Sequence, residues 1–120
     1  MKRVDVERLL SEADHLATSL RYREAAETLV VAADLAEELG DLVLAREIRT
    51  WARRHVVVDW ARRRWPDADV ILASVTPAGG QPGSERTRFW IVRNEGRRVA
   101  LELVSVSRRG RVTVLEKVRE

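Results

Sequence analysis

The chain contains no cysteine among its 120 residues. This absence excludes disulfide bonds, thiolate metal sites and cysteine nucleophiles, and it fits a reducing compartment. The sequence also lacks a run of about 20 apolar residues, which a membrane-spanning helix needs. Charged side chains follow the first methionine too closely for an apolar signal segment. We therefore expect a soluble, cytoplasmic protein that has no membrane partner.

Histidine is nearly absent as well, since the chain has only His15 and His55. Paired histidines at metal-ligand spacing are missing, and so are the HExxH and GxSxG motifs. The glycine-rich stretch Gly79 to Gly83 lacks the following helix and lysine of a phosphate-binding loop. These absences favour a non-catalytic protein without metal or cofactor, although they leave an acid–base mechanism open.

The charges are unevenly distributed along the chain. Residues 1–41 carry five basic and ten acidic side chains, whereas residues 42–120 carry seventeen and nine. Twenty of the 22 basic residues are arginine. A guanidinium group suits phosphates and carboxylates, but a GC-rich coding sequence produces the same bias. The arginine excess therefore does not by itself indicate a nucleic-acid partner.

Three segments show the 3, 4, 7 spacing of apolar residues that is typical of an amphipathic helix. The first runs from Val4 to Ser19, and the second runs from Tyr22 to Leu39, where Gly40 is a C-terminal stop. The third begins after Asp41, whose side chain can cap it. It ends at Trp65-Pro66, because the residue before a proline resists helical geometry.

A tyrosine, small alanines and large apolar residues recur at helical spacing in the first two helices, at Ala13, Leu16, Tyr22, Ala25, Leu29 and Ala32. This pattern resembles a tetratricopeptide-type helical hairpin. It departs from the family at Leu9, where tryptophan is preferred, and at Leu20, where a turn glycine is usual. The resemblance covers about residues 9–39, and no second repeat follows. It implies one hairpin of this type and, from the family's function, the binding of peptide segments.

After Pro66 the pattern changes to alternating apolar residues, which predicts strands. We expect four of them, at Val70 to Thr76, Arg86 to Arg93, Arg97 to Ser107 and Arg111 to Val118. The short connections at Asn94 to Gly96 and at Arg108 to Gly110 favour antiparallel hairpins. The expected fold is α+β, with three N-terminal antiparallel helices packed on a four-stranded antiparallel meander sheet. It forms one domain, with a helical part at 1–65 and a sheet part at 67–120.

The predicted sheet is apolar on both faces, whereas a sheet with one solvated face alternates apolar and polar residues. We expect an apolar patch on the second face, formed by Trp90, Val92, Val104, Val106 and Leu115. Either dimerisation or strong curvature of the sheet around Trp60 would cover it.

The third helix contains the tetrapeptide Trp-Ala-Arg-Arg twice, at a spacing of nine residues. Nine residues correspond to half a rotation, so Trp51 and Trp60 point to opposite sides of the helix. His55 and Asp59 lie one turn apart within the apolar arc and are able to touch. A carboxylate that fixes the tautomer of an imidazole leaves the other ring nitrogen as a base. The alternative is a self-satisfied pair, with Arg62 or Arg63 bonded to Asp59.

Three functions remain open for this sequence. The first is a non-catalytic interaction domain that associates with itself or a protein through its hairpin or its sheet. The second is a small-molecule pocket or acid–base enzyme centred on His55 and Asp59. In this hypothesis Trp51, Arg62 and Trp90 bind the ligand, and the hydroxyl comes from Ser74, Thr76 or Ser105. The third is nucleic-acid binding through Arg62, Arg63 and Arg64.

A designed origin is a further alternative, in which case the chain has no natural function. The round length and the regular helix punctuation are typical of designed sequences. The scarcity of lysine and the consecutive valines Val56 to Val58 within a helix are not.

Overall fold

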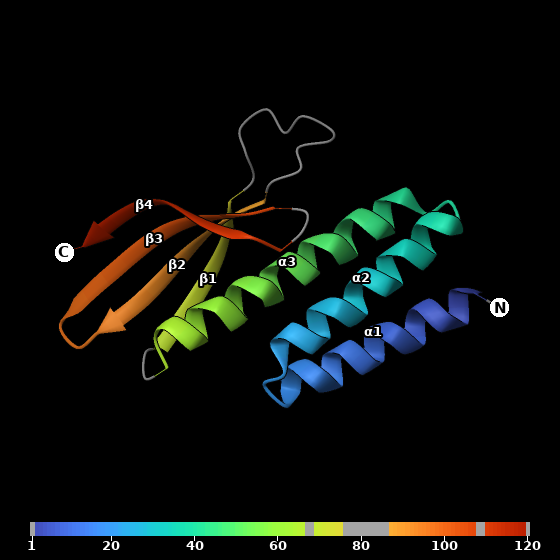
Figure 1. Ribbon diagram of the computed structural model, residues 1–120, viewed down its shortest axis with the longest axis horizontal. Helices are drawn as coiled ribbons and strands as arrows, with labels where there is room; N and C mark the ends of the chain where they lie inside the picture. Colours follow the sequence, from blue (N-terminus) through green and yellow to red (C-terminus); the bar gives the residue numbers. More distant parts are fainter. Residues whose placement is uncertain (1, 67–68, 76–86, 108–109, 120) are drawn as a thin grey trace. The chain divides into compact units, whose positions relative to one another are not determined.

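The computed structural model describes residues 2–66, 69–75, 87–107 and 110–119, and Figure 1 shows their arrangement. The helices are α1 (Lys2–Thr18), α2 (Tyr22–Glu38) and α3 (Leu42–Arg64). The strands are β1 (Asp69–Val75), β2 (Thr87–Glu95), β3 (Arg98–Val106) and β4 (Val112–Arg119). The predicted α+β class, with helices that precede an antiparallel sheet, is confirmed.

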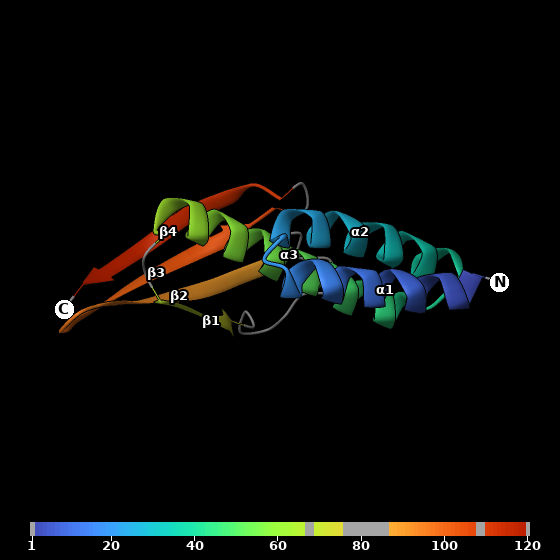
Figure 2. The same ribbon diagram turned by 90° about the horizontal axis from the view of Figure 1, so that it is seen from below.

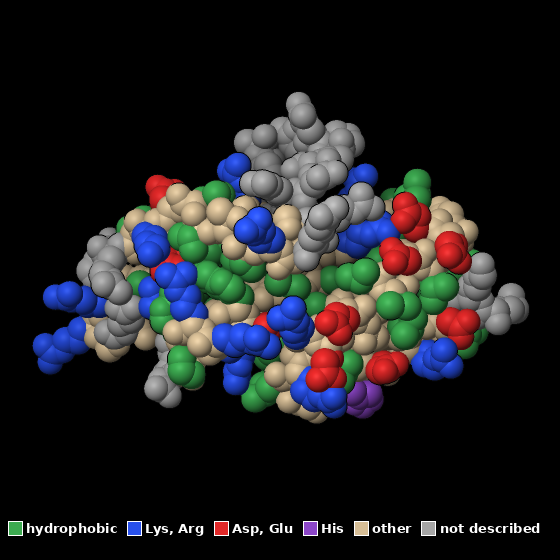
Figure 3. All heavy atoms as spheres, viewed as in Figure 1, with side chains coloured by type: hydrophobic (Ala, Val, Ile, Leu, Met, Phe, Trp, Pro, Cys, Tyr) green, Lys and Arg blue, Asp and Glu red, His purple; other side chains and the backbone are tan. Residues whose placement is uncertain are grey.

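The chain forms two compact units, Met1–Val56 and Val57–Glu120. The division lies inside α3, so the last part of this helix belongs with the sheet. Figure 3 shows that most of the visible acidic side chains gather over the helices, whereas basic side chains gather over the sheet. The acidic side chains of the sequence therefore gather mainly on the helices and the basic side chains mainly on the sheet, as the charge distribution along the sequence predicts.

The two turns between helices have the same form. Leu20 has a positive φ of 63°, and Arg21 N–H donates to the carbonyl of Leu16 at 2.8 Å. Gly40 has a φ of 83°, and Asp41 N–H donates to the carbonyl of Ala36 at 3.0 Å. A left-handed residue closes each helix in this way because it returns the chain to the last free carbonyls. Glycine adopts this conformation freely, whereas leucine does not.

Alanine dominates the core of the N-terminal unit. Small side chains let helix backbones approach closely, and both ribbon views show α1 and α2 side by side (Figures 1 and 2). The alanine face predicted for the second helix is thus buried. The buried core consists of Val6, Ala13, Ala25, Ala26, Leu29, Ala32, Ala33, Ala36, Ala45, Ile48 and Ala52.

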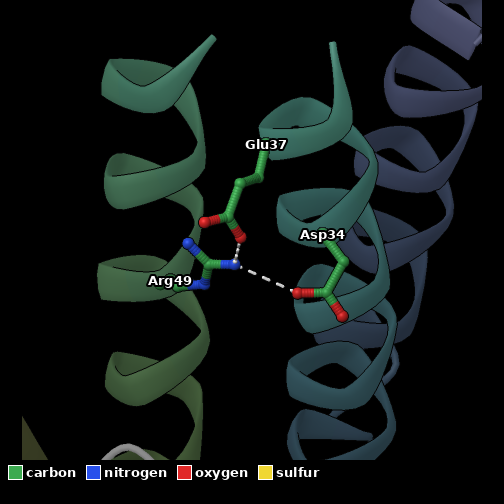
Figure 4. A network of polar contacts seen from close by, with 3 residues as sticks. All are labelled: Asp34, Glu37 and Arg49. Atoms are coloured by element: carbon green, nitrogen blue, oxygen red, sulfur yellow. Dashed lines mark hydrogen bonds and ion pairs between the residues drawn. The ribbon is translucent and has the colours of Figure 1, made fainter. Parts of the chain in front are cut away.

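Polar contacts hold the first half of α3 in place. Arg49 Nη2 donates to Glu37 Oε2 at 2.6 Å and to Asp34 Oδ1 at 3.1 Å, both on α2 (Figure 4). The hydrogen bond that Arg49 donates to Glu37 is the main cause that raises the pKa of Arg49. Asp41 Oδ1 accepts a hydrogen bond from Leu44 N–H at 3.2 Å, which confirms the predicted cap.

The sheet of the C-terminal unit has the strand order β1-β2-β3-β4, and each neighbouring pair is antiparallel. Glu95 pairs with Arg98, so Gly96 and Arg97 alone form the turn between β2 and β3, and Gly96 has a φ of 69°. This tight turn sets the register of the whole hairpin. A bulge at Leu103/Val104 shifts the pairing of β3 with β4.

The sheet has a buried face, which we name the inner face, and a more accessible one, which we name the outer face. The buried side chains of the inner face on β2 and β3 are Phe89, Ile91, Arg93, Ala100, Glu102, Val104 and Val106. On the outer face, Trp90, Val92, Leu101 and Leu103 are half-buried.

This arrangement corrects one prediction. Val104 and Val106 do not share a face with Trp90 and Val92, because Trp90 pairs with Leu103 whereas Val104 pairs with Phe89. The sequence-based assignment took the wrong phase for β3. The apolar patch on the second face exists, but Leu101 and Leu103 form it in place of the two valines.

Candidate functional site

His55 lies half-buried on α3, where its ring packs against Tyr22, the first residue of α2. The ring centroids are 5.8 Å apart and the planes are inclined by 51°. Burial lowers the pKa of His55, and the charge of Arg54 lowers it further, whereas Asp14 on α1 opposes the shift. Burial therefore favours the neutral imidazole, which is the form that a general base requires.

Asp59 has a different partner. Arg63 Nε lies 3.1 Å from Asp59 Oδ2, and the two side chains form an ion pair one turn apart on the same helix. The Asp59 side chain is 23% exposed, whereas that of Arg63 is 66% exposed. The contact between Arg63 and Asp59 that the sequence-based alternative allowed is thus present, whereas a self-satisfied pair of His55 and Asp59 stays a prediction. The acid–base role of His55 and Asp59 stays a prediction.

The other predicted ligand-binding residues are dispersed over the two units. Trp51 is 44% exposed and belongs to the N-terminal unit. Arg62 is exposed on the last turns of α3, and Trp90 is half-buried on the outer face of the sheet. Of the hydroxyl candidates, Ser105 is buried on β3. Thr76 lies outside the described residues, as do the side chain of Ser74 and the glycine-rich stretch 79–83.

The end of α3 stacks cations on aromatic rings. The guanidinium carbon of Arg64 lies 5.0 Å from the ring centroid of Trp60 and 4.9 Å from that of Trp65. The two indoles meet edge to face at 5.5 Å. Of the three arginines predicted to bind nucleic acid, Arg63 thus contacts a carboxylate and Arg64 contacts two rings, while all three stay exposed. Cation–π contacts of this kind help to order the end of the helix.

The inner face holds a buried ion pair that the sequence-based prediction missed. Arg93 Nη2 donates to Glu102 Oε1 at 3.2 Å, and the two side chains are 6% and 5% exposed. The ring of Trp65 lies over Arg93, with 3.7 Å from the centroid to the guanidinium carbon. Within the described part of the chain, no group donates a hydrogen bond to Glu102 Oε2. The pair lies on a diagonal, since Arg93 pairs with Ala100 and Ile91 pairs with Glu102.

The sequence did carry a signal for this pair. Arg93 follows Phe89 and Ile91 at alternate positions of one strand. In the next strand Glu102 lies at the alternate position between Ala100 and Val104, so each charge falls on an apolar face. With a two-residue turn at Gly96-Arg97, pairing brings the two positions close together. Charged side chains are almost never fully buried unless they are paired.

The outer face of the sheet carries a partly accessible apolar patch. Its centre consists of two cross-strand pairs, Trp90 with Leu103 and Val92 with Leu101. Val99 and Val118 extend it and are 40% and 39% exposed. The face is therefore a candidate docking surface.

Metal and membrane features are missing from the described residues. No group of three His, Cys, Asp or Glu side chains in the described ranges could hold a metal ion. No helix among the described residues is long and apolar enough to cross a membrane. No protein-family model, curated protein or solved structure matches this chain.

Proposed function

We propose that this protein is a non-catalytic interaction domain that binds another protein surface through the outer face of its sheet. The observation that carries the proposal is the centre of this face, where Trp90, Val92, Leu101 and Leu103 are all apolar and all accessible in part. A solvated sheet face has polar residues at such positions. A contiguous apolar patch on a soluble protein marks an interaction site.

Trp90 is the natural anchor of this surface. Tryptophan is enriched among the residues that contribute most to binding, because a large rigid ring buries much apolar area at little entropic cost. Its cross-strand partner on the same face is Leu103. We expect the Trp90 side chain to contribute more to binding than any other outer-face residue.

Photo-crosslinking in cells that produce the protein tests the proposal. A photoreactive amino acid is placed either at Val99 on the outer face or at Val31 on α2, which are 40% and 51% exposed. We expect protein adducts from Val99, and we expect Trp90→Asp to abolish them because the carboxylate would be desolvated on binding. Adducts from Val31 alone would overturn the proposal and favour the helical hairpin as the binding surface.

The hairpin surface is the second candidate, because it also exposes apolar side chains. Val30 and Val31 lie on α2, and Leu42 and Val43 begin α3, with exposures between 45% and 71%. Peptide binding by this surface is what the tetratricopeptide resemblance implies.

The remaining hypotheses stay predictions with their own tests. An acid–base or small-molecule site is supported by the half-buried His55, whose pKa is lowered, and by the exposed Trp51 one turn before it. Quenching of Trp51 fluorescence by planar anions, lost in Trp51→Phe, would support it. Nucleic-acid binding is supported by the exposed Arg62 to Arg64, and it requires affinity that falls steeply with salt.

A further inference from the structure

We propose that the partner of the outer face is a second copy of this chain, whose outer face stacks on the first in a two-fold symmetric pair. The inference rests on the proposed function, since it names the occupant of the same surface. A sheet buries each apolar face against another layer, and a second identical sheet supplies that layer. In such an isologous interface, each contact occurs twice.

The size of the face reaches the lower limit for a specific dimer interface. Neighbouring strands lie about 4.8 Å apart, and each residue extends a strand by about 3.4 Å. A sheet of four strands with about eight residues each therefore has a face of roughly 19 by 27 Å, or roughly 500 Å². Two such faces bury on the order of 1,000 Å² when they stack, even if both are treated as flat. Specific interfaces begin at about this value.

The charge of the face favours a second copy over a strongly charged partner. Residues 57–120 carry 13 basic and 8 acidic side chains, a net charge of +5. The exposed charges of β2 and β4 that the register places on the outer face are Arg88 and Glu116, one of each sign. Because the net positive charge lies elsewhere, two outer faces can stack without net repulsion, whereas an acidic partner would find little to bind there.

The register predicts which residues meet. A two-fold axis that runs parallel to the strands, between β2 and β3, stacks β2 of one copy on β3 of the other. Trp90 then faces Leu103 of the partner subunit, and Val92 faces Leu101 of the partner subunit. Each large ring thus meets a branched aliphatic side chain, which is the complementary packing that two aligned sheets require.

The first test is the mass of the purified full chain in sedimentation equilibrium over a wide range of concentrations. We expect a monomer–dimer equilibrium in the wild type and a dissociation constant raised about a hundredfold or more in Leu103→Glu, because the dimer buries the carboxylate twice. The matched control is Val4→Glu, which places the same charge on an exposed position of α1 that belongs to neither candidate surface. It should dimerise like the wild type, and circular dichroism should show that both variants are folded.

The second test uses the absence of cysteine, because an introduced thiol has no competing partner in the chain. Val92→Cys and Leu101→Cys chains of different length are mixed and treated with a short bis-maleimide crosslinker, because sheets that stack about 10 Å apart hold facing thiols beyond the reach of a disulfide. We expect the mixed crosslinked product in excess over either self-linked product. A monomer at all concentrations, equal dimerisation of Leu103→Glu and wild type, or no mixed crosslinked product would overturn the inference. Outer-face adducts to a different protein from Val99 would also overturn it, but they would leave the proposed function intact.

Discussion

The buried pair Arg93–Glu102 makes a sharp prediction about stability. Removal of one partner from a buried ion pair costs about 3 to 5 kcal/mol, because an uncompensated charge stays behind, whereas apolar replacement of both is often neutral or stabilising. The two side chains are 6% and 5% exposed, so solvent cannot screen a remaining charge. Only one carboxylate oxygen has a partner among the described residues, so the pair recovers only part of its desolvation cost.

We therefore expect Arg93→Met, which leaves Glu102 as an uncompensated buried charge, to lower the free energy of unfolding by about 3 kcal/mol or more. Glu102→Leu should cause a smaller loss, because Arg93 keeps the ring of Trp65 over its guanidinium group. The double variant should lie within about 1 kcal/mol of the wild type, although additive effects would exceed the loss in Arg93→Met alone.

Urea unfolding followed by tryptophan fluorescence measures all four proteins, since Trp65 reports directly on this region. The double-mutant cycle isolates the coupling between the two side chains. Single losses below about 1 kcal/mol, or a double variant that shows the additive loss, would refute the reasoning.

Three further predictions concern single residues. Leu20→Gly should raise the free energy of unfolding by about 1 kcal/mol, because leucine occupies a left-handed conformation. Leu20→Ala is the matched control, and thermal melts in which the two variants behave alike would contradict the explanation. Asp41→Ala should cost about 1 kcal/mol through loss of the α3 cap, with Asp41→Asn retaining most of it in the same melt. Because the pKa of His55 is lowered, the unfolded state binds more protons, so stability should fall as the pH drops from about 6.5 towards that lowered value and then level off. His55→Gln should flatten this slope, and an NMR titration midpoint of His55 at or above 6.5 would show the premise to be wrong.

Local signals in the sequence were sufficient for most of the elements. Gly40 and Asp41 mark the end of α2 and the start of α3, and the structure places both in these roles. Such signals work because capping depends on the residue itself and on neighbours within one turn. Leu20 lacks the glycine signal, yet it closes α1 in the same conformation.

The face of β3 shows where local reasoning failed. Val104 and Val106 have the same residue type as the outer-face Val92, and periodicity alone does not say which set is buried. The two-residue turn at Gly96-Arg97 decides the phase, because a shift of one residue moves every side chain to the other face.

The candidate sites divide in the same way. The sequence by itself determined the helices, the alternation of the strands, the one-turn spacing of His55 and Asp59 and the excess of arginine near the end of α3. The tertiary structure alone determined that His55 contacts Tyr22, that Asp59 binds Arg63 within its own helix, and that Arg93 and Glu102 share one buried site. The reason is physical, since periodicity specifies the side of an element on which a residue lies, whereas the partner of a charge depends on which surfaces pack together and exclude water.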